Sequence, residues 1–231
     1  MGAQTLRFDT PDGPVEVAVT DCVVAGWTGR DKAAIDHHIE ELAEIGVPGP
    51  STVPLYYRVA VEQLTQGDHV QVIGGDSSGE VEPVLVATDT GLYLTVGSDH
   101  TDRKVETYSI AVSKQMCPKV LGTTAWPVSL DDDLDALVLE AKATIKGKEE
   151  PYQTGTLALI RPLKDLVDGY GGLKPGTVML CGTVPVTGGT RRVSCAYAVP
   201  PRLSPKMVRS RPLQAKRVPH TTMKKKRIAK T

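Results

Sequence analysis

The chain has 231 residues, 40% hydrophobic and 23% charged, which excludes a wholly disordered chain, a collagen-like repeat and a long coiled coil. Its 27 basic and 27 acidic residues cancel formally but are unevenly distributed. Residues 1–189 hold 14 basic and all 27 acidic side chains, whereas residues 190–231 hold 13 basic side chains and no acidic one. We therefore expect an acidic body with a basic end.

Cysteine usage and hydropathy indicate the setting of the protein. The four cysteines are widely separated, form no C-x-x-C pair and are too few for a disulfide framework. The N-terminal residues do not have the pattern of a signal peptide. No apolar run approaches the roughly 20 residues that a membrane span needs. These features predict a soluble, cytoplasmic protein without membrane association.

The first elements are predicted from turn and cap residues. Strands are expected over 4–9 and 15–25, joined by a turn at Pro11-Asp12-Gly13-Pro14. A helix is expected over 31–45, because Asp31 can cap its start and Gly46 and Pro48 end the pattern. Its apolar residues fall within one arc of the helical wheel.

The rest of the body is predicted to be predominantly β, because Val is abundant and only one Phe is present. Short strands are expected between 53 and 125, including VETYSIAV and KVLGTTAW, and again over 154–162 and 177–184. A second helix is expected over 131–146. Residues 1–189 are interpreted as one domain. Residues 190–231, which contain five prolines and no acidic residue, are interpreted as a mostly disordered tail.

Carboxylates converge on one predicted hairpin. Glu80 and Glu82 alternate along a strand and therefore share one face. The turn at Asp89-Thr90-Gly91 leads into the next strand, which ends at Asp99. A loop of Asp89-Thr90 places Asp99 opposite Glu80, and a loop of Thr90-Gly91 places it opposite Glu82.

Three anions about 5 Å apart repel one another unless a cation lies between them. An all-oxygen ligand set suits Mg²⁺, Mn²⁺ or Ca²⁺ better than Zn²⁺. The alternative is that the two glutamates form the solvated face of an edge strand, which Pro83 would also favour. Both interpretations stay open at this stage.

Five segments, in order, resemble motifs of the fumarylacetoacetate hydrolase superfamily. The motifs are an l-F-x-K-P segment, an E-x-E strand, an N-D-x-T-x-R-D-like segment, a lysine before a Pro-containing segment, and a late p-G-D-v-i-x-t-G-T-P. Their counterparts here are Pro54–Arg58, Glu80–Glu82, Ser98–Arg103, Ser113–Pro118 and Lys174–Pro185. The pattern departs from the family at Arg58, which replaces Lys, at Thr177, which replaces Asp, and at Val184, which is inserted. The distance from Glu82 to Asp99 is also shorter than usual, so the resemblance is to a divergent branch.

The resemblance implies an α+β, predominantly β fold, a mixed β-sandwich or β-roll with a few peripheral helices. It also implies a homodimer and a divalent ion, Mg²⁺ or Mn²⁺ with Ca²⁺ as an option, held by Glu80, Glu82 and Asp99. The implied substrate is a small carboxylate, a 2-oxo acid or 1,3-dicarbonyl compound, which reacts through an enolate. C–C bond hydrolysis is favoured, and decarboxylation, isomerisation and hydration also fit.

The same resemblance implies roles for further residues. Lys114 would add positive charge near a substrate oxygen, while Gly182 and Thr183 would hold a substrate carboxylate or oxyanion. Arg58 and Arg103 would contact substrate, although Arg103 can equally pair with a site carboxylate or with Asp102.

A lid helix, which small family members use to activate water, would correspond to residues 31–45. Two His/Glu pairs are available there, His37 with Glu40 and His38 with Glu41. The helical wheel favours the second pair as the catalytic one, because His38 lies inside the apolar arc. Residues 46–51 would be the hinge of this lid.

The basic tail suggests a rival function, binding of nucleic acid or another anion. Only Tyr197 is aromatic in residues 190–231, which argues against base stacking and therefore against nucleic acid as a partner. A solvated tail and a change of coding frame near Thr190 are the other two interpretations of this region.

Overall fold

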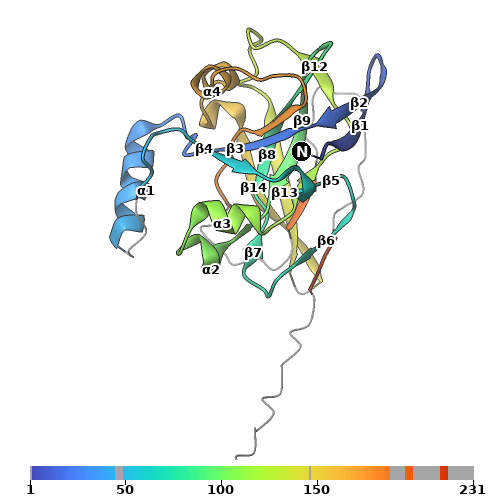
Figure 1. Cartoon of the computed structure of the whole chain (residues 1–231). Helices are drawn as coiled ribbons and strands as arrows, with labels where there is room; N and C mark the ends of the chain where they lie inside the picture. The colour runs from blue at the N-terminus through green and yellow to red at the C-terminus, as the bar shows by residue number, and fades with distance from the viewer. Residues whose placement is uncertain (1, 45–48, 146, 188–195, 200–213, 218–231) are drawn as a thin grey trace, which may run out of the picture.

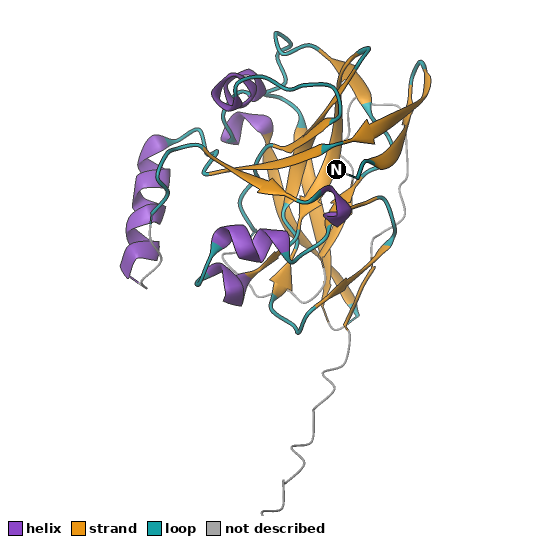
Figure 2. Ribbon diagram, viewed as in Figure 1, coloured by secondary structure: helices purple, strands orange, loops and turns teal. Residues whose placement is uncertain are grey.

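The computed structural model describes residues 2–44, 49–145, 147–187, 196–199 and 214–217. Strands form the body of the protein and the helices lie at its periphery (Figure 2). This arrangement confirms the predicted α+β, predominantly β class. None of the helices in these ranges is long and apolar enough to cross a membrane.

The main sheet is mixed, with strand order β4-β3-β15-β8-β9-β11-β5 and with β12 also paired to β9. Parallel pairing joins β15 to β3 and β11 to β5, whereas the other neighbours are antiparallel. Its strands are β3 (Asp21–Gly26), β4 (Leu55–Val59), β5 (Leu64–Thr65), β8 (Val81–Thr88), β9 (Gly91–Asp99), β11 (Lys119–Leu121), β12 (Trp126–Val128) and β15 (Thr177–Leu180).

Smaller sheets complete the β structure. A hairpin joins β1 (Gln4–Thr10) to β2 (Gly13–Val19), and a three-stranded sheet has the order β14-β13-β16. Two short pairs join β7 to β10 and β6 to β17. The remaining bounds are β6 (His69–Val72), β7 (Ser77–Ser78), β10 (Thr101–Asp102), β13 (Val138–Ile145), β14 (Lys148–Thr156), β16 (Ala196–Val199) and β17 (Gln214–Arg217).

Strand β8 lies between two hydrophobic cores. Val81 and Leu85 pack in a core with side chains from β13, β14 and α4 (Leu163–Tyr170), whereas Val84 and Val86 pack in a core with side chains from the β1–β2 hairpin. Alternate residues of β8 therefore serve opposite faces of the main sheet. Because both faces of β8 are buried, the position of this strand, which carries Glu82 into the candidate site, is fixed.

Helix α1 (Lys32–Glu44) confirms the first predicted helix. Its start is capped as expected, because Asp31 Oδ1 accepts hydrogen bonds from the backbone nitrogens of Ala33 and Ala34. Ile35 is the only buried side chain among those described in α1. In Figure 1 the helix stands beside the body rather than against it.

Two predicted elements are wrong. Residues 105–112, expected as a strand, lie in and between α2 (Arg103–Glu106) and α3 (Ile110–Gln115). The side chains of Asp102 and Ser109 cap these helices, and capping outweighs the β propensity of the segment. Residues 131–146, expected as a helix, contain β13, in which Leu139, Ala141 and Ala143 are buried at alternate positions against β14.

Other boundaries also differ from the predictions. The strand expected over 15–25 is interrupted at Thr20, and KVLGTTAW contributes β11 and the start of β12 rather than one strand. The strand expected over 154–162 ends at Thr156 and is followed by a 3-10 helix, Leu157–Leu159; another covers Val61–Gln63. Helix α4 was not predicted. Strands β16 and β17 fall within the predicted tail, and the other residues of that tail lie outside the described ranges.

Candidate metal centre

The β8–β9 hairpin places three carboxylates together. Thr88 pairs with Gly91, so the loop is Asp89-Thr90, the first of the two predicted registers. In this register the backbone nitrogen of Asp99 donates to the carbonyl oxygen of Glu80 at 2.9 Å. One carboxylate oxygen from each of three residues lies within 4.8 Å of the others: Glu80, Glu82 and Asp99.

Burial makes the cluster unfavourable without a cation. Glu82 and Asp99 are 2% and 0% exposed, so the glutamates do not form the solvated face of an edge strand. Burial raises the pKa of Glu82 well above its ordinary value, and the neighbouring charge of Asp99 raises it further. The cluster therefore favours either a proton or a cation close to Glu82.

Lys114, at the end of α3, provides one such cation. Its Nζ donates a hydrogen bond to Asp99 Oδ2 and lies 3.7 Å from Glu80 Oε2. Burial alone would lower the pKa of Lys114, but the charges of Asp99, Glu80 and Glu82 outweigh it and raise the pKa. Lys114 is therefore held as an ammonium ion beside the carboxylates.

Lys119 is a second buried cation, which the sequence analysis missed. Its Nζ lies 2.9 Å from Asp99 Oδ1 and its side chain is 0% exposed. The same nitrogen donates to the carbonyl oxygens of His100, Lys114 and Cys117. The sequence feature that could have indicated this burial is a lysine directly before Val120 and Leu121, in the short segment between Pro118 and Gly122.

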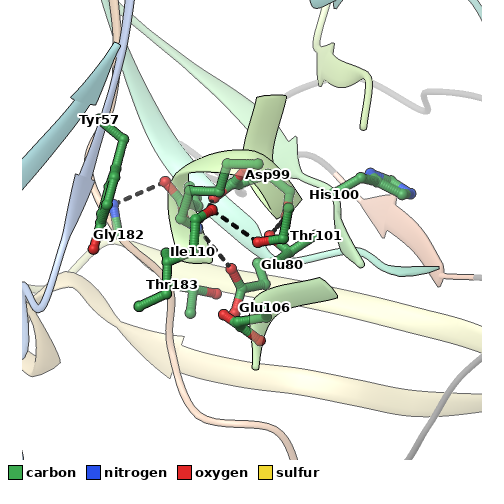
Figure 3. Close-up of polar contacts among 12 residues, drawn as sticks. Tyr57, Glu80, Asp99, His100, Thr101, Glu106, Ile110, Gly182 and Thr183 are labelled. Atoms are coloured by element: carbon green, nitrogen blue, oxygen red, sulfur yellow. Dashed lines mark hydrogen bonds and ion pairs between the residues drawn. The ribbon is translucent and has the colours of Figure 1, made fainter. Parts of the chain in front are cut away.

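Arg103 orients Glu80. Its guanidinium lies 2.9 Å from Glu80 Oε1 and 3.0 Å from Glu106 Oε2, and its Nε donates to Ser78 Oγ at 2.7 Å. Asp102 instead accepts hydrogen bonds from the first turn of α2. Of the two partners predicted for Arg103, the structure therefore shows a carboxylate of the cluster, Glu80, rather than Asp102. It also places Glu106 beside the cluster (Figure 3).

Gly182 and Thr183 direct hydrogen bonds toward the Glu-x-Glu strand. The backbone nitrogen of Gly182 donates to Glu82 Oε2 at 2.9 Å (Figure 3). Thr183 Oγ1 donates to the carbonyl oxygen of Val81 at 2.8 Å. Gly182 has a φ of 100°, and a Cβ there would lie 1.7 Å from Thr28 Oγ1. Only glycine fits this close approach.

Arg58 is not brought to the cluster. Its guanidinium pairs with Asp21, and the side chain is 72% exposed. The neighbouring Tyr57 faces the site instead, with its ring centroid 6.0 Å from Lys114 Nζ. Tyr57 Oη also accepts a hydrogen bond from Trp27 Nε1 at 3.2 Å.

The predicted lid residues lie on α1, which stands beside the body of the protein in Figure 1. His37 Nε2 lies 3.4 Å from Glu41 Oε1, and their side chains are 73% and 58% exposed. This contact pairs His37 with Glu41 rather than with Glu40, which is also exposed. The side chain of His38 lies outside the described part of the chain, as do residues 46–48 of the predicted hinge.

A family model described as protein of unknown function (DUF2848) matches residues 25–204, more than half of the chain. The chain belongs to the DUF2848 family. No curated protein matches the sequence.

Solved structures resemble this DUF2848 protein over most of its length. A fumarylacetoacetate hydrolase family protein from Yersinia pestis has a TM-score of 0.61 and 16% identity, covering 93% of this chain and 100% of its own. A 5-carboxymethyl-2-hydroxymuconate delta-isomerase from Mycobacterium smegmatis has a TM-score of 0.59 and 16% identity, covering 93% and 98%. A 2-keto-3-deoxyarabinonate dehydratase has a TM-score of 0.60 and 13% identity, covering 87% of this chain and 75% of its own. The likeness confirms the predicted fold, which this chain shares with structures that include a fumarylacetoacetate hydrolase family protein.

The carboxylates of this DUF2848 protein fit a divalent metal ion. All three candidate ligands are carboxylate oxygens, the donors that Mg²⁺ and Mn²⁺ prefer. Asp99 Oδ1 is buried and accepts no well-aligned hydrogen bond, even though Lys119 Nζ lies 2.9 Å away. A buried carboxylate oxygen without a hydrogen bond is costly, and a metal ion would satisfy it.

Proposed function

We propose that this DUF2848 protein is a metal-dependent enzyme that converts a 2-oxo acid or 1,3-dicarbonyl compound through an enolate. The observation that carries the proposal is the convergence of Glu80, Glu82 and Asp99 beside the buried ammonium of Lys114. The shared fold adds support, because similar structures include proteins named as an isomerase and a dehydratase. Among the reactions that fit an enolate, we propose C–C bond hydrolysis first.

The three carboxylates would hold Mg²⁺ or Mn²⁺, with Ca²⁺ as a further option. When bound, the ion would supply positive charge beside the substrate oxygens and so would stabilise an enolate. Arg103 keeps Glu80 oriented through the 2.9 Å ion pair, and Gly182 does the same for Glu82 through its backbone nitrogen. These contacts preorganise the ligand oxygens before substrate arrives.

Lys114 has a separate role in the proposal. Its ammonium group lies at the edge of the cluster, between Asp99 and the ring of Tyr57. A fixed positive charge at this place favours the binding of a carboxylate substrate and the developing charge on its oxygen. Because the pKa of Lys114 is raised, it acts as a cation rather than as a nucleophile.

The lid helix α1 would supply the base that hydrolysis needs. A histidine of α1 would take a proton from water, and a glutamate on the next turn would orient the imidazole. We retain His38 with Glu41 as the favoured pair and His37 with Glu40 as the alternative. Glu41 belongs to the favoured pair, and in the structure it also contacts His37. In this proposal α1 moves toward the carboxylates when substrate binds.

A turnover assay tests the function. The full chain would be incubated with Mn²⁺ or Mg²⁺ and a panel of 2,4-dioxo acids, 2-oxo dicarboxylic acids and 2-keto-3-deoxy sugar acids, with products identified by mass spectrometry. We expect pyruvate and a second carboxylic acid from a 2,4-dioxo acid, and no product after metal is removed with EDTA.

Matched variants make the assay decisive. Glu82→Gln removes a candidate ligand, so we expect turnover to be lost. Glu149→Gln changes an exposed glutamate that pairs with Lys142, so we expect turnover to be kept. Equal turnover by the Glu82 variant, or binding of no divalent ion by the parent protein, would contradict the proposal.

A homodimer and a cytoplasmic location stay predictions. Light scattering of the purified chain measures the first directly. Nucleic-acid binding through residues 190–231 is not proposed, because no contact of the described residues supports it.

A further inference from the structure

We propose that Gln153 is a positioning residue for the metal centre and that Thr183 acts with it on the strand that carries Glu80 and Glu82. This inference rests on the proposed function, since it concerns the affinity of the same carboxylates for a divalent ion. Gln153 lies on β14, far from the hairpin in sequence, and its side chain is 1% exposed.

Gln153 and Thr183 hold both backbone groups of Val81, the residue between the two glutamates. Gln153 Oε1 accepts a hydrogen bond from the Val81 nitrogen at 2.9 Å. Gln153 Nε2 donates to Thr183 Oγ1 and to the Val184 carbonyl oxygen, each at 2.7 Å. Thr183 Oγ1 donates to the Val81 carbonyl oxygen at 2.8 Å, which closes a ring of hydrogen bonds.

The ring replaces a missing strand partner. On this side of β8, the pairing with β15 ends where Leu180 meets Val84, and Cys181 adds one hydrogen bond to the Pro83 carbonyl oxygen. The backbone of Val81 lies beyond the end of that ladder. A buried peptide group without a partner costs roughly 1–3 kcal/mol, so side chains have to take the place of the absent strand.

The direction of each hydrogen bond follows from the backbone groups. The Val81 nitrogen can only donate and the Val184 carbonyl can only accept, so the amide of Gln153 has one possible orientation. Its second N–H points at Thr183 Oγ1, whose own hydrogen then goes to the Val81 carbonyl. The Thr183 hydroxyl is therefore used within the protein and has no hydrogen left to donate to a substrate. This assigns the Thr183 hydroxyl to positioning of the glutamates. The substrate contact that the family resemblance implies for Gly182 and Thr183 stays a prediction.

A metal ion needs its ligand oxygens at fixed positions. Glu80 and Glu82 lie one residue on either side of Val81, so a shift of its peptide groups moves both carboxylates together. Loss of a residue that orients the ligands typically weakens metal binding by about 10- to 100-fold. We expect a loss of this size when the ring is broken.

The test measures Mn²⁺ binding to the full chain by titration calorimetry and by electron paramagnetic resonance, without substrate. The variants are Gln153→Met, which keeps the side-chain length, and Thr183→Val, which keeps the side-chain shape. We expect each to weaken Mn²⁺ affinity by about 10- to 100-fold and the double variant to be no weaker than the worse single one. Thr183→Ser keeps the hydroxyl and should restore affinity to within about threefold of the parent.

Gln66→Met is the matched control. Gln66 also holds both backbone groups of one residue, since its amide accepts from the Arg7 nitrogen and donates to the Arg7 carbonyl oxygen, and it donates to the Gly122 carbonyl oxygen as well. It has no contact with the carboxylates among the described interactions, so its loss should lower the melting temperature without changing Mn²⁺ affinity. This separates a positioning effect from a general loss of stability.

The outcomes distinguish the two proposals. If the parent binds Mn²⁺ and Gln153→Met and Thr183→Val bind it equally well, the positioning role is wrong and the proposed function stands. If the parent binds no Mn²⁺, both proposals fail. If Gln153→Met does not fold, the comparison of Thr183→Val with Thr183→Ser decides, and equal affinities of those two variants overturn the inference.

Discussion

Lys119 Nζ lies 2.9 Å from Asp99 Oδ1, and both side chains are 0% exposed. Burial by itself would raise the pKa of Asp99, but the charges of Lys114 and Lys119 outweigh it and lower the pKa. Asp99 is therefore kept as a carboxylate, the form that a metal ion binds. Lys119 Nζ also donates to the Lys114 carbonyl oxygen. This one buried cation therefore holds both Asp99, a candidate metal ligand, and the end of α3, which carries Lys114.

Loss of Lys119 is expected to destabilise the protein strongly. Lys119→Met leaves Asp99 with one cation fewer and removes the side-chain donor that three carbonyl oxygens share, which corresponds to about 3–5 kcal/mol. Urea unfolding measures the change. Lys142→Met is the control, because Lys142 pairs with Glu149 on the surface and should cost less than about 1 kcal/mol. Similar losses in the two variants would contradict a buried ion pair.

Metal binding is expected to strengthen as pH rises. The pKa of Glu82 is raised above its ordinary value of 4.5 by burial and by Asp99. In the metal-free protein its contribution to stability is therefore fully present below pH 4.5 and is lost as pH rises through the raised pKa. Mn²⁺ has to displace the proton on Glu82, so the melting-temperature increase caused by Mn²⁺ should grow as the pH rises above 4.5.

Thermal unfolding with Mn²⁺ and with EDTA across this pH range gives the measurement. Glu82→Gln cannot ionise and should lose both the Mn²⁺ effect and this pH dependence. Glu149→Gln should keep both, because it changes an exposed side chain. An Mn²⁺ effect that is constant with pH would contradict the prediction.

A methyl group at residue 182 is expected to disrupt the centre. Gly182→Ala combines a φ of 100° with a Cβ 1.7 Å from Thr28 Oγ1, so the backbone that donates to Glu82 has to move. We expect a loss of more than about 3 kcal/mol in urea unfolding and of Mn²⁺ affinity. Gly13→Ala has a similar φ, 111°, but no atom within 4 Å, and should cost only about 1–2 kcal/mol. Equal losses at the two glycines would show that backbone strain alone matters.

The lid glutamates are expected to differ in their effect on turnover. If Glu41 orients the histidine that activates water, Glu41→Gln should lower kcat by roughly 100- to 10,000-fold. Mn²⁺ affinity should not change, since α1 stands apart from strands β8 and β9, which carry Glu82 and Asp99. Glu40→Gln alters the neighbouring exposed carboxylate and should leave kcat within about threefold of the parent. A larger effect at Glu40 would favour the pair of His37 with Glu40.

Local features were predictable from the sequence. The hairpin turn and the alternation of its strands bring Asp99 to Glu80 and Glu82 in either register, so the carboxylate cluster followed from pattern alone. The start of α1 followed from Asp31 in the same way. The segments at 105–112 and 131–146 were predicted wrongly, because capping side chains in the first and hairpin pairing with β14 in the second outweigh local propensity.

The sequence by itself determined the hairpin, the identity of the three acidic residues and the resemblance to a fold. Only the tertiary structure decided which groups surround them. Lys119 reaches Asp99 because β11 pairs with β9, and Gln153 reaches Val81 because the β13–β14 layer packs against β8. The physical reason is that neighbours in a hairpin are set by turn length and side-chain alternation, whereas partners 20 to 100 residues apart meet only when sheets pair and pack.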